Sequence, residues 1–158
     1  MADRHYAGWI AAYALQHAAD RRDVVAFARA APANSWDESS ALDGWAKRDI
    51  LAHLAGGNDR MLQTIVLAVL EGTPLTESDL DPDTDAENAR GVAERRPWSI
   101  ARLIAELERE ETELQDLLAR LTEEHEHARS GAMTYTLGEL FRAVASERHD
   151  IEHLRQRR

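Results

Sequence analysis

The chain has 158 residues, of which 44% are hydrophobic and 30% charged, with a formal net charge of -10 and no cysteine. This length and composition predict one globular domain over residues 1–158 rather than a disordered chain. The acidic charge argues against a nucleic-acid partner, and the lack of cysteine excludes disulfides, thiolate metal ligands and a cysteine nucleophile.

The N-terminal segment predicts neither secretion nor membrane insertion. It carries charges at Asp3 and Arg4 and has no sustained apolar run, so a signal peptide is not expected. No other stretch reaches the ~20 apolar residues that cross a bilayer. We therefore expect a cytoplasmic protein without a membrane partner.

Two helices are predicted in the first half of the chain. Apolar residues recur with helical spacing over residues 6–31 and again over residues 46–71. A loop rich in Pro, Asn, Ser and Asp separates the two helices. Gly72 and Pro74 should end the second helix.

The second half predicts a long connection and two further helices. Residues 73–98 contain three prolines and only one short helix-compatible piece, over 84–95. The third helix should begin after Ser99 as N-cap and end near Glu123. The fourth should begin at Thr136, which forms a capping box with the glutamate three residues later, and run to the C-terminus.

Four amphipathic helices predict an all-α four-helix bundle. Short loops join helices 1 and 2 and helices 3 and 4, whereas the long crossover between helices 2 and 3 permits an up-down-down-up topology. The histidines favour this topology. His53 lies near the beginning of helix 2, and His149 and His153 lie near the end of helix 4. If helices 2 and 4 were parallel, these groups would be roughly 15 Å or more apart.

The three histidines predict a metal site. His149 and His153 are four residues apart on one helix face, with Cβ atoms roughly 6 Å apart. With His53 they would give three ligands and an open position, as in catalytic zinc sites, although imidazole also suits nickel, iron or copper. Taken singly, an HxxxH pair is more often surface decoration, and His53 could be a hydrogen-bonded core histidine.

A second feature indicates polar residues inside the bundle. The apolar stripe of helix 3 is interrupted at Glu110 and Glu111, and that of helix 1 at Asp20 and Arg21. One of the glutamates could orient a ligand histidine or act as a base, since metal-bound imidazoles usually donate their second N–H to a carboxylate or carbonyl. The alternative is a solvated pair at the edge of the stripe.

The remaining candidates have simpler interpretations. His125 and His127 belong to a polar segment that reads as a solvated loop, and His17 lies deeper than the proposed metal site. The four tryptophans could line a ligand pocket or pack the bundle ends. The adjacent glycines Gly56 and Gly57 could leave a gap for substrate or allow close helix packing.

The segment Gly44-Trp45-Ala46-Lys47-Arg48-Asp49-Ile50-Leu51-Ala52-His53-Leu54 resembles a signature of the DinB/YfiT-like family, a superfamily of metal-dependent thiol S-transferases related to the N-terminal domains of mycothiol-dependent maleylpyruvate isomerases. The C-terminal Glu147-Arg148-His149-Asp150-Ile151-Glu152-His153-Leu154 is similar to its closing His-x-x-x-His helix. The crossover, with Asp85-Ala86-Glu87-Asn88 before Pro97-Trp98-Ser99, also resembles many members. One departure is Ala46, where the family commonly has a serine N-cap.

The resemblance implies a metal triad of His53, His149 and His153 and a function. We expect a divalent ion, with zinc or nickel as first candidates, that activates water or a thiol such as mycothiol or bacillithiol against a small electrophile. A homodimer is also implied. The alternatives are a non-catalytic bundle that binds a small molecule, with the metal structural or absent, and an interaction module that acts through dimerisation.

Overall fold

The computed structural model describes residues 3–42, 44–56, 58–80 and 84–144, together with residues 152 and 154. Across these residues the regular structure is helical, and an isolated bridge between Ser39 and Ala46 is the one β-type pairing. The all-α prediction is therefore confirmed. None of the described helices combines the length and apolar character needed to cross a bilayer.

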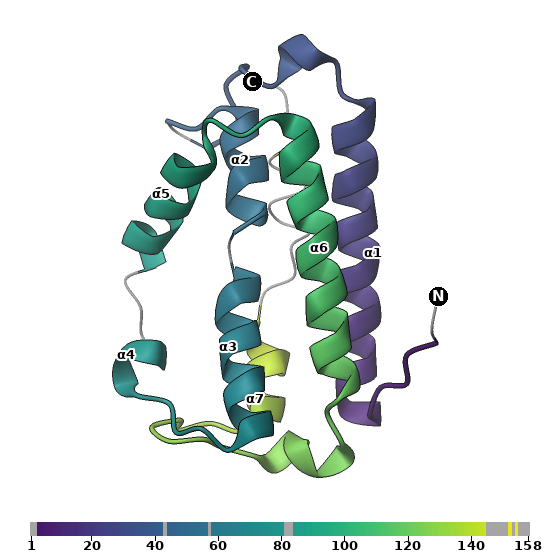
Figure 1. The fold of residues 1–158 in the computed structure, drawn as a ribbon, viewed down its shortest axis with the longest axis vertical. Coiled ribbons are helices and arrows are strands. Elements are labelled where there is room, and N and C mark those ends of the chain that lie inside the picture. The colour runs from purple at the N-terminus through teal and green to yellow at the C-terminus, as the bar shows by residue number, and fades with distance from the viewer. Residues whose placement is uncertain are drawn as a thin grey trace.

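Two long helices, α1 (Gly8–Ala30) and α6 (Ile100–Ala119), pack along each other over most of their length (Figure 1). They run in opposite directions, because Trp9 near the start of α1 bonds to Thr122 just past the end of α6. Further along, the Gln115 side chain donates to the backbone oxygen of Ala14. The helix predicted over residues 6–31 is confirmed as α1.

The helix predicted over residues 46–71 is wrong in one respect, because it is two helices, α2 (Lys47–Leu54) and α3 (Asn58–Glu71). Glycine lacks a side chain and destabilises a helix interior, and Gly56 follows the end of α2. A Cβ at Gly56 would lie 2.5 Å from Cζ of Arg95, so the position needs a residue without one. Gly72, at φ +70°, ends α3 as predicted.

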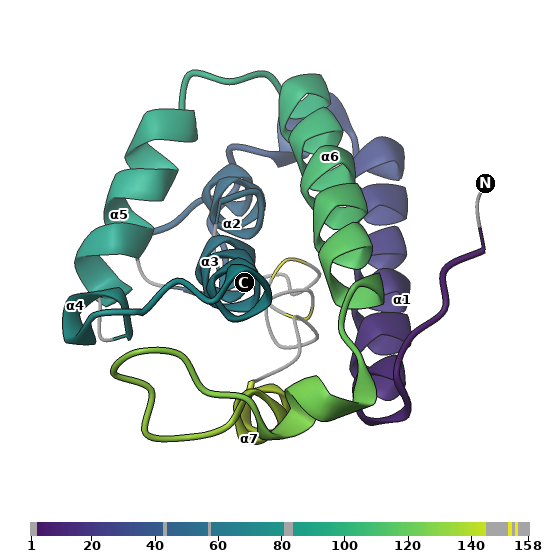
Figure 2. The same ribbon diagram turned by 60° about the horizontal axis from the view of Figure 1, so that its bottom comes forward.

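The crossover contains two short helices, α4 (Glu77–Leu80) and α5 (Thr84–Arg95). The short piece predicted over 84–95 is confirmed as α5, whereas α4 was not predicted. At the start of α4, the carboxylate of Asp79 accepts hydrogen bonds from the backbone N–H and the hydroxyl of Thr76, each at 2.8 Å. Figure 2 shows α4 and α5 on one side of α2 and α3, with α1 and α6 on the other.

Local capping sets the starts of the later helices. Ser99 accepts a hydrogen bond from the backbone of Arg102 and begins α6 as predicted. Thr136 and Glu139 form the predicted capping box at the start of α7 (Leu137–Ala143). The prediction that this helix runs unbroken to the C-terminus is wrong, because α7 ends at Ala143 and the backbone of Val144 is extended. The third helix ends at Ala119, earlier than the expected Glu123, and a 3-10 helix η2 (Glu123–His127) follows. Another 3-10 helix, η1 (Ala33–Ser35), follows α1.

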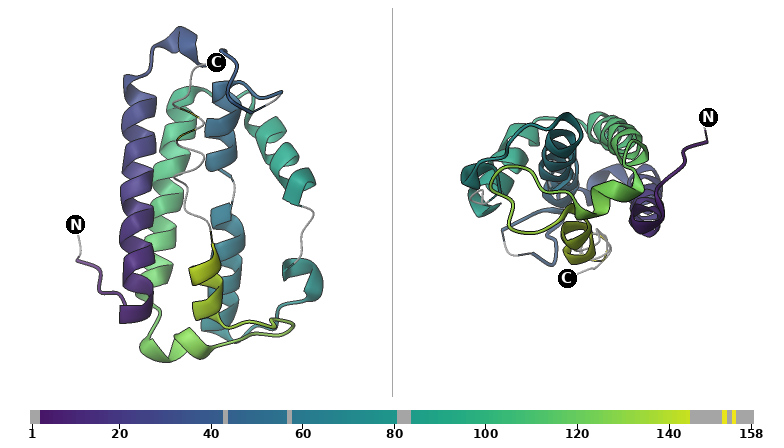
Figure 3. Two further views of the ribbon diagram at one scale, coloured as in Figure 1. Left: turned by 180° about the vertical axis from the view of Figure 1, so that it is seen from behind. Right: turned by 90° about the horizontal axis from the view of Figure 1, so that it is seen from below.

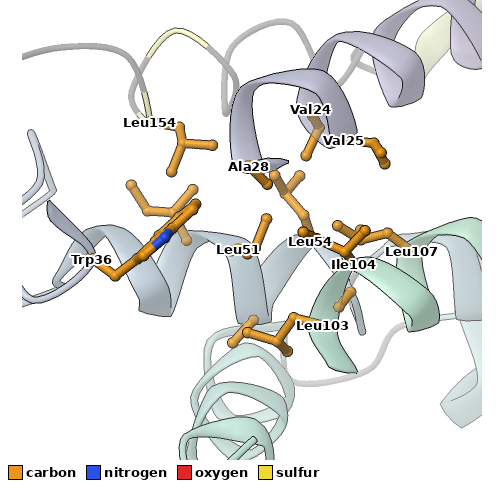
Figure 4. Packing of buried hydrophobic residues seen from close by; sticks show 13 residues of the cluster. Val24, Val25, Ala28, Trp36, Leu51, Leu54, Leu103, Ile104, Leu107 and Leu154 are labelled. Atoms are coloured by element: carbon orange, nitrogen blue, oxygen red, sulfur yellow. The ribbon is translucent and has the colours of Figure 1, made fainter. Parts of the chain in front are cut away.

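The apolar interior is divided into two clusters at the two ends of the long helices. The upper cluster, as Figure 1 is drawn, joins α1, α2 and α6, with Trp36 packed against it (Figure 4). The lower cluster joins α1, α3, α6 and α7, which Figure 3 shows from behind and from below. The long helices α1 and α6 therefore contribute apolar residues to both clusters, and between the two clusters the buried residues of α1 and α6 are largely polar.

Candidate metal ligands and a buried polar belt

His53 lies in the last turn of α2 and is half-buried. Its ring contacts that of Trp45, with centroids 5.4 Å apart and planes inclined by 55°. Its neighbours Ala52 and Leu54 are buried in the upper cluster. The helix is anchored at its start by Asp49, which accepts the backbone N–H of Ala46 at 3.0 Å. This bond is half of a capping box, and it partly replaces the serine cap that Ala46 lacks.

Leu154 connects the end of the chain to the same region. Its side chain is fully buried in the upper cluster with Leu51 and Leu54, which flank His53 on α2 (Figure 4). Leu137 and Phe141, near the start of α7, belong instead to the lower cluster. Between Leu137 and Leu154 the chain therefore passes from the lower cluster to the upper one.

The predicted metal triad is only partly within the described residues. His53 is described, whereas His149 and His153 lie outside them. Within the described part of the chain, no group of three His, Asp or Glu side chains is placed to hold a metal ion. His53 is a half-buried imidazole beside the upper cluster, which also contains Leu154. Its ring nitrogen is a donor of the kind that binds divalent metals. The residue present at position 53 thus fits the group that the sequence predicts, and the triad stays a prediction.

A belt of buried or half-buried polar residues lies between the two apolar clusters. Three of its members come from α1 and three from α6, and we call this set the polar belt: His17, Asp20, Arg21, Glu110, Glu111 and Gln115. The sequence predicted polar residues inside the bundle from the interruptions at Asp20-Arg21 and Glu110-Glu111. Glu110 has 2% of its surface exposed, so the alternative of a solvated pair is wrong for Glu110.

Glu111 holds much of the belt together. One carboxylate oxygen lies 2.6 Å from Nδ1 of His17, and the other accepts a hydrogen bond from Nε2 of Gln115 at 2.8 Å. The hydroxyl of Tyr6 donates to Oε1 of Gln115 at 2.5 Å. Buried polar groups need such partners, and here α1 and α6 supply them across their interface.

Glu110 points toward the other side of α6, where α3 packs. Its carboxylate lies 4.0 Å from Nε of Arg60, and Gln63 donates to its backbone oxygen at 3.5 Å. Glu110 follows Leu107 by about one helical turn, and Leu107 packs in the upper cluster with Leu54. Glu110 is therefore close to the level at which α2 ends, just past His53.

The surroundings of Tyr6, at the edge of the polar belt, shift the pKa of its hydroxyl. Burial raises the pKa of the Tyr6 hydroxyl above its ordinary value, and the nearby carboxylate of Glu111 adds to this effect. The positive charge of Arg4 lowers the same pKa, but its effect is smaller than that of burial. The neutral hydroxyl that donates to Gln115 is thus favoured in the folded protein.

The other predicted candidates lie outside the polar belt. His125 was expected in a solvated loop, but it lies in η2, where its Nδ1 accepts the backbone N–H of Thr122 at 2.8 Å. His127 is exposed. Trp36 is buried in the upper cluster, and Trp9 packs against Phe141.

Sequence reasoning missed Arg95, which has 1% of its surface exposed at the end of α5. Arginine is rarely buried to this extent, so its position could not be expected from residue type. The sequence signal that could have indicated it is Gly56, which was interpreted as a gap for substrate or for helix packing. The space is instead filled by the guanidinium of Arg95.

Comparison with known protein families gives a match over most of the chain. Residues 17–148 match a family model described as the mycothiol maleylpyruvate isomerase N-terminal domain. The matched range includes His53 and the polar belt and ends one residue before His149. Neither the curated proteins nor the solved structures gave a match.

Proposed function

Because the chain belongs to the mycothiol maleylpyruvate isomerase N-terminal domain family, within the DinB/YfiT-like superfamily, we propose that it is a metal-dependent enzyme. It would activate a low-molecular-weight thiol, or water, for transfer to a small electrophile or for isomerisation of it. The ligands would be His53, His149 and His153, with zinc or nickel as the ion and mycothiol or bacillithiol as the thiol. The bound ion would supply a thiolate or hydroxide at neutral pH.

The burial of Leu154 supports this proposal most. It places the residue after His153 in the apolar cluster that surrounds the end of α2. We propose that the chain continues beyond α7 into this cluster and completes a single-domain up-down-down-up bundle, although α7 itself ends at Ala143, where Val144 is extended.

The chain's own residues would shape the site. Trp45 covers the His53 ring and shields it from water on one side. Both carboxylate oxygens of Glu111 are engaged by His17 and Gln115, so we assign Glu111 to holding α1 against α6. We assign the orienting role to Glu110, which is buried just past the level of His53, since a carboxylate fixes a ligand imidazole through its second N–H.

A turnover assay tests the proposal. The full chain, purified without an affinity tag and loaded with zinc or nickel, is mixed with mycothiol or bacillithiol and a panel of small electrophiles, and thiol consumption is followed. We expect turnover that is lost in His53→Ala and retained in His127→Ala, whose ring is exposed. Equal turnover in His53→Ala and the unsubstituted chain would contradict the assignment of His53.

The second candidate function is non-catalytic binding of a small molecule. It is favoured by a cavity of about 420 Å³ beside α3 and α5, a volume typical of ligand pockets. Metal-loaded protein that turns over no thiol with any electrophile, yet is stabilised against heat by a small molecule, would favour binding over catalysis.

A further inference from the structure

Arg95 is a buried cation with few polar partners. Nη1 donates to the backbone oxygen of Gly91 at 3.2 Å and lies 3.8 Å from a carboxylate oxygen of Glu94, whose side chain is mostly exposed. Nε and Nη2 are buried and have no hydrogen-bond acceptor among the residues that the structure describes. Because buried donors without acceptors are uncommon and destabilising, these two N–H groups call for an explanation.

The surroundings hold the guanidinium in one place. Trp98 lies below it, with Cζ of Arg95 5.3 Å from the ring centroid. The backbone of Gly56 also approaches it, since an added Cβ there would lie 2.6 Å from Nη1 and 2.9 Å from Nη2. The guanidinium is therefore closely contacted by a tryptophan ring and by a bare backbone. A planar cation held in this way is preorganised to receive an oxyanion through two parallel hydrogen bonds.

Arg95 forms part of the wall of a cavity of about 420 Å³. Gly56, Met61 and Thr64 line it from the side of α2 and α3, and Asn88 and Gly91 line it from α5. Arg60 also lines the cavity, and its Nε lies 4.0 Å from the carboxylate of Glu110, so the cavity borders the polar belt at this residue. A volume of this size admits a small organic molecule as well as a single inorganic ion.

The charged groups at the cavity differ in burial. Glu87 pairs with Arg90 on α5, and both side chains are more than half exposed. Asp79 is engaged by Thr76, and its pKa is lowered by these hydrogen bonds. The acidic groups thus lie at the solvent side with partners, and the buried charge is the cation of Arg95.

We propose that the cavity between α3 and α5 binds a small organic anion, whose carboxylate or phosphate oxygens accept hydrogen bonds from Nε and Nη2 of Arg95. Thr64 and Asn88 would face the uncharged part of the ligand. The inference does not depend on the metal or on the proposed catalysis, because Arg95 is neither a proposed metal ligand nor a member of the polar belt.

Titration of the isotope-labelled full chain with succinate and with inorganic phosphate tests the proposal. Gly56 and Gly91 line the cavity, and glycine amides are well separated in a nitrogen-proton correlation spectrum. We expect saturable shifts of these two amides and of the Arg95 Nε–H signal, whereas Gly8 and Gly138, on α1 and α7, should not shift. Shifts with succinate alone would indicate a carboxylate site, and shifts with phosphate alone would indicate a phosphate site. Shifts with both would indicate that either oxyanion binds. No saturable shift with either anion would overturn the proposal.

A matched pair of variants tests the role of the guanidinium. Arg95→Met keeps an unbranched side chain over Trp98 but removes the donors, and binding should weaken by roughly tenfold to a hundredfold. Arg102→Met is the control, because Arg102 also lies over the Trp98 ring, at 3.7 Å, but does not line the cavity. It should bind as the unsubstituted chain does.

The thermal stability of Arg95→Met separates binding from a structural role. If the buried N–H groups serve a ligand, their removal should leave the midpoint of unfolding without ligand unchanged or higher. A large loss of stability together with unchanged anion binding would contradict the proposal. If Arg95→Met does not fold, Arg95→Lys, which keeps the charge but not the paired donors, should show the same loss of affinity.

Discussion

Glu111 of the polar belt and Arg95 at the α5 cavity are both charged side chains in the interior, and they differ in the partners that the structure gives them. Glu111 accepts a hydrogen bond from Gln115 within α6 and pairs with His17 of α1. Arg95 keeps two N–H groups without an acceptor among the described residues. The difference indicates that Glu111 fixes how α1 packs on α6, whereas Arg95 keeps hydrogen-bonding capacity for a ligand.

The largest expected effect is from breaking the belt at Glu111. Glu111→Leu removes the carboxylate that pairs with His17 and one of the two acceptors of the Gln115 amide, and we expect a loss of about 2–5 kcal/mol in the free energy of unfolding. Chemical denaturation measures it. The control is Glu113→Leu, since Glu113 lies on the exposed face of α6 and pairs with the half-exposed Arg109, so about 0.5 kcal/mol or less is expected. Similar losses in both variants would show that the belt is not a structural element.

Filling the space beside Arg95 should have the next largest effect. In Gly56→Ala the new Cβ would lie 2.5 Å from Cζ of Arg95, so the buried guanidinium must move, at about 1–3 kcal/mol. Gly91→Ala is the control, and it should change the stability in the opposite direction. Its Cβ would lie 3.6 Å from Nη1, an ordinary contact, and alanine should stabilise α5 by up to about 1 kcal/mol. A stabilising Gly56→Ala would mean that Arg95 is not confined there.

A smaller effect is expected at the start of α2, which carries His53. Ala46→Ser supplies the side-chain acceptor that completes the capping box begun by Asp49, and stability should rise by about 0.5–1 kcal/mol. Thermal unfolding measures this gain. Ala46→Val, which adds volume without an acceptor, is the comparison and should give no gain.

The smallest effect concerns the pH dependence of stability at Tyr6. Its pKa is raised in the folded protein, mainly by burial, so its contribution is fully present below the unfolded pKa near 10. This contribution is lost as pH rises through the folded pKa. We expect Tyr6→Phe to remove this alkaline loss, which should be small because Tyr6 is half-buried. Identical alkaline unfolding curves for both proteins would contradict it.

Most of the fold could be predicted because its signals are local. Ser99 and Thr136 cap the helices that follow them, and Gly72 ends α3, each through bonds or backbone angles within a few residues. The break between α2 and α3 was missed because its cause is distant, since Gly56 is needed where Arg95 from α5 approaches.

The candidate site was only partly predictable. His53 could be singled out from its motif, and the interruption at Glu110 indicated a polar interior. The pairing of His17 with Glu111 could not be expected, because it depends on the register of α1 against α6. Arg95 was missed because its burial depends on tertiary contacts with Gly56 and Trp98 that its own sequence neighbourhood does not indicate.

Metal content measured by elemental analysis on tag-free protein tests the central claim most directly. The claim is that one ion is held by His53, His149 and His153 and that the belt histidine His17 takes no part. We predict about one zinc or nickel ion per chain in the unsubstituted protein and in His17→Ala, and loss of the ion in His53→Ala and His149→Ala. Equal metal content in His53→Ala and the unsubstituted chain would contradict the account.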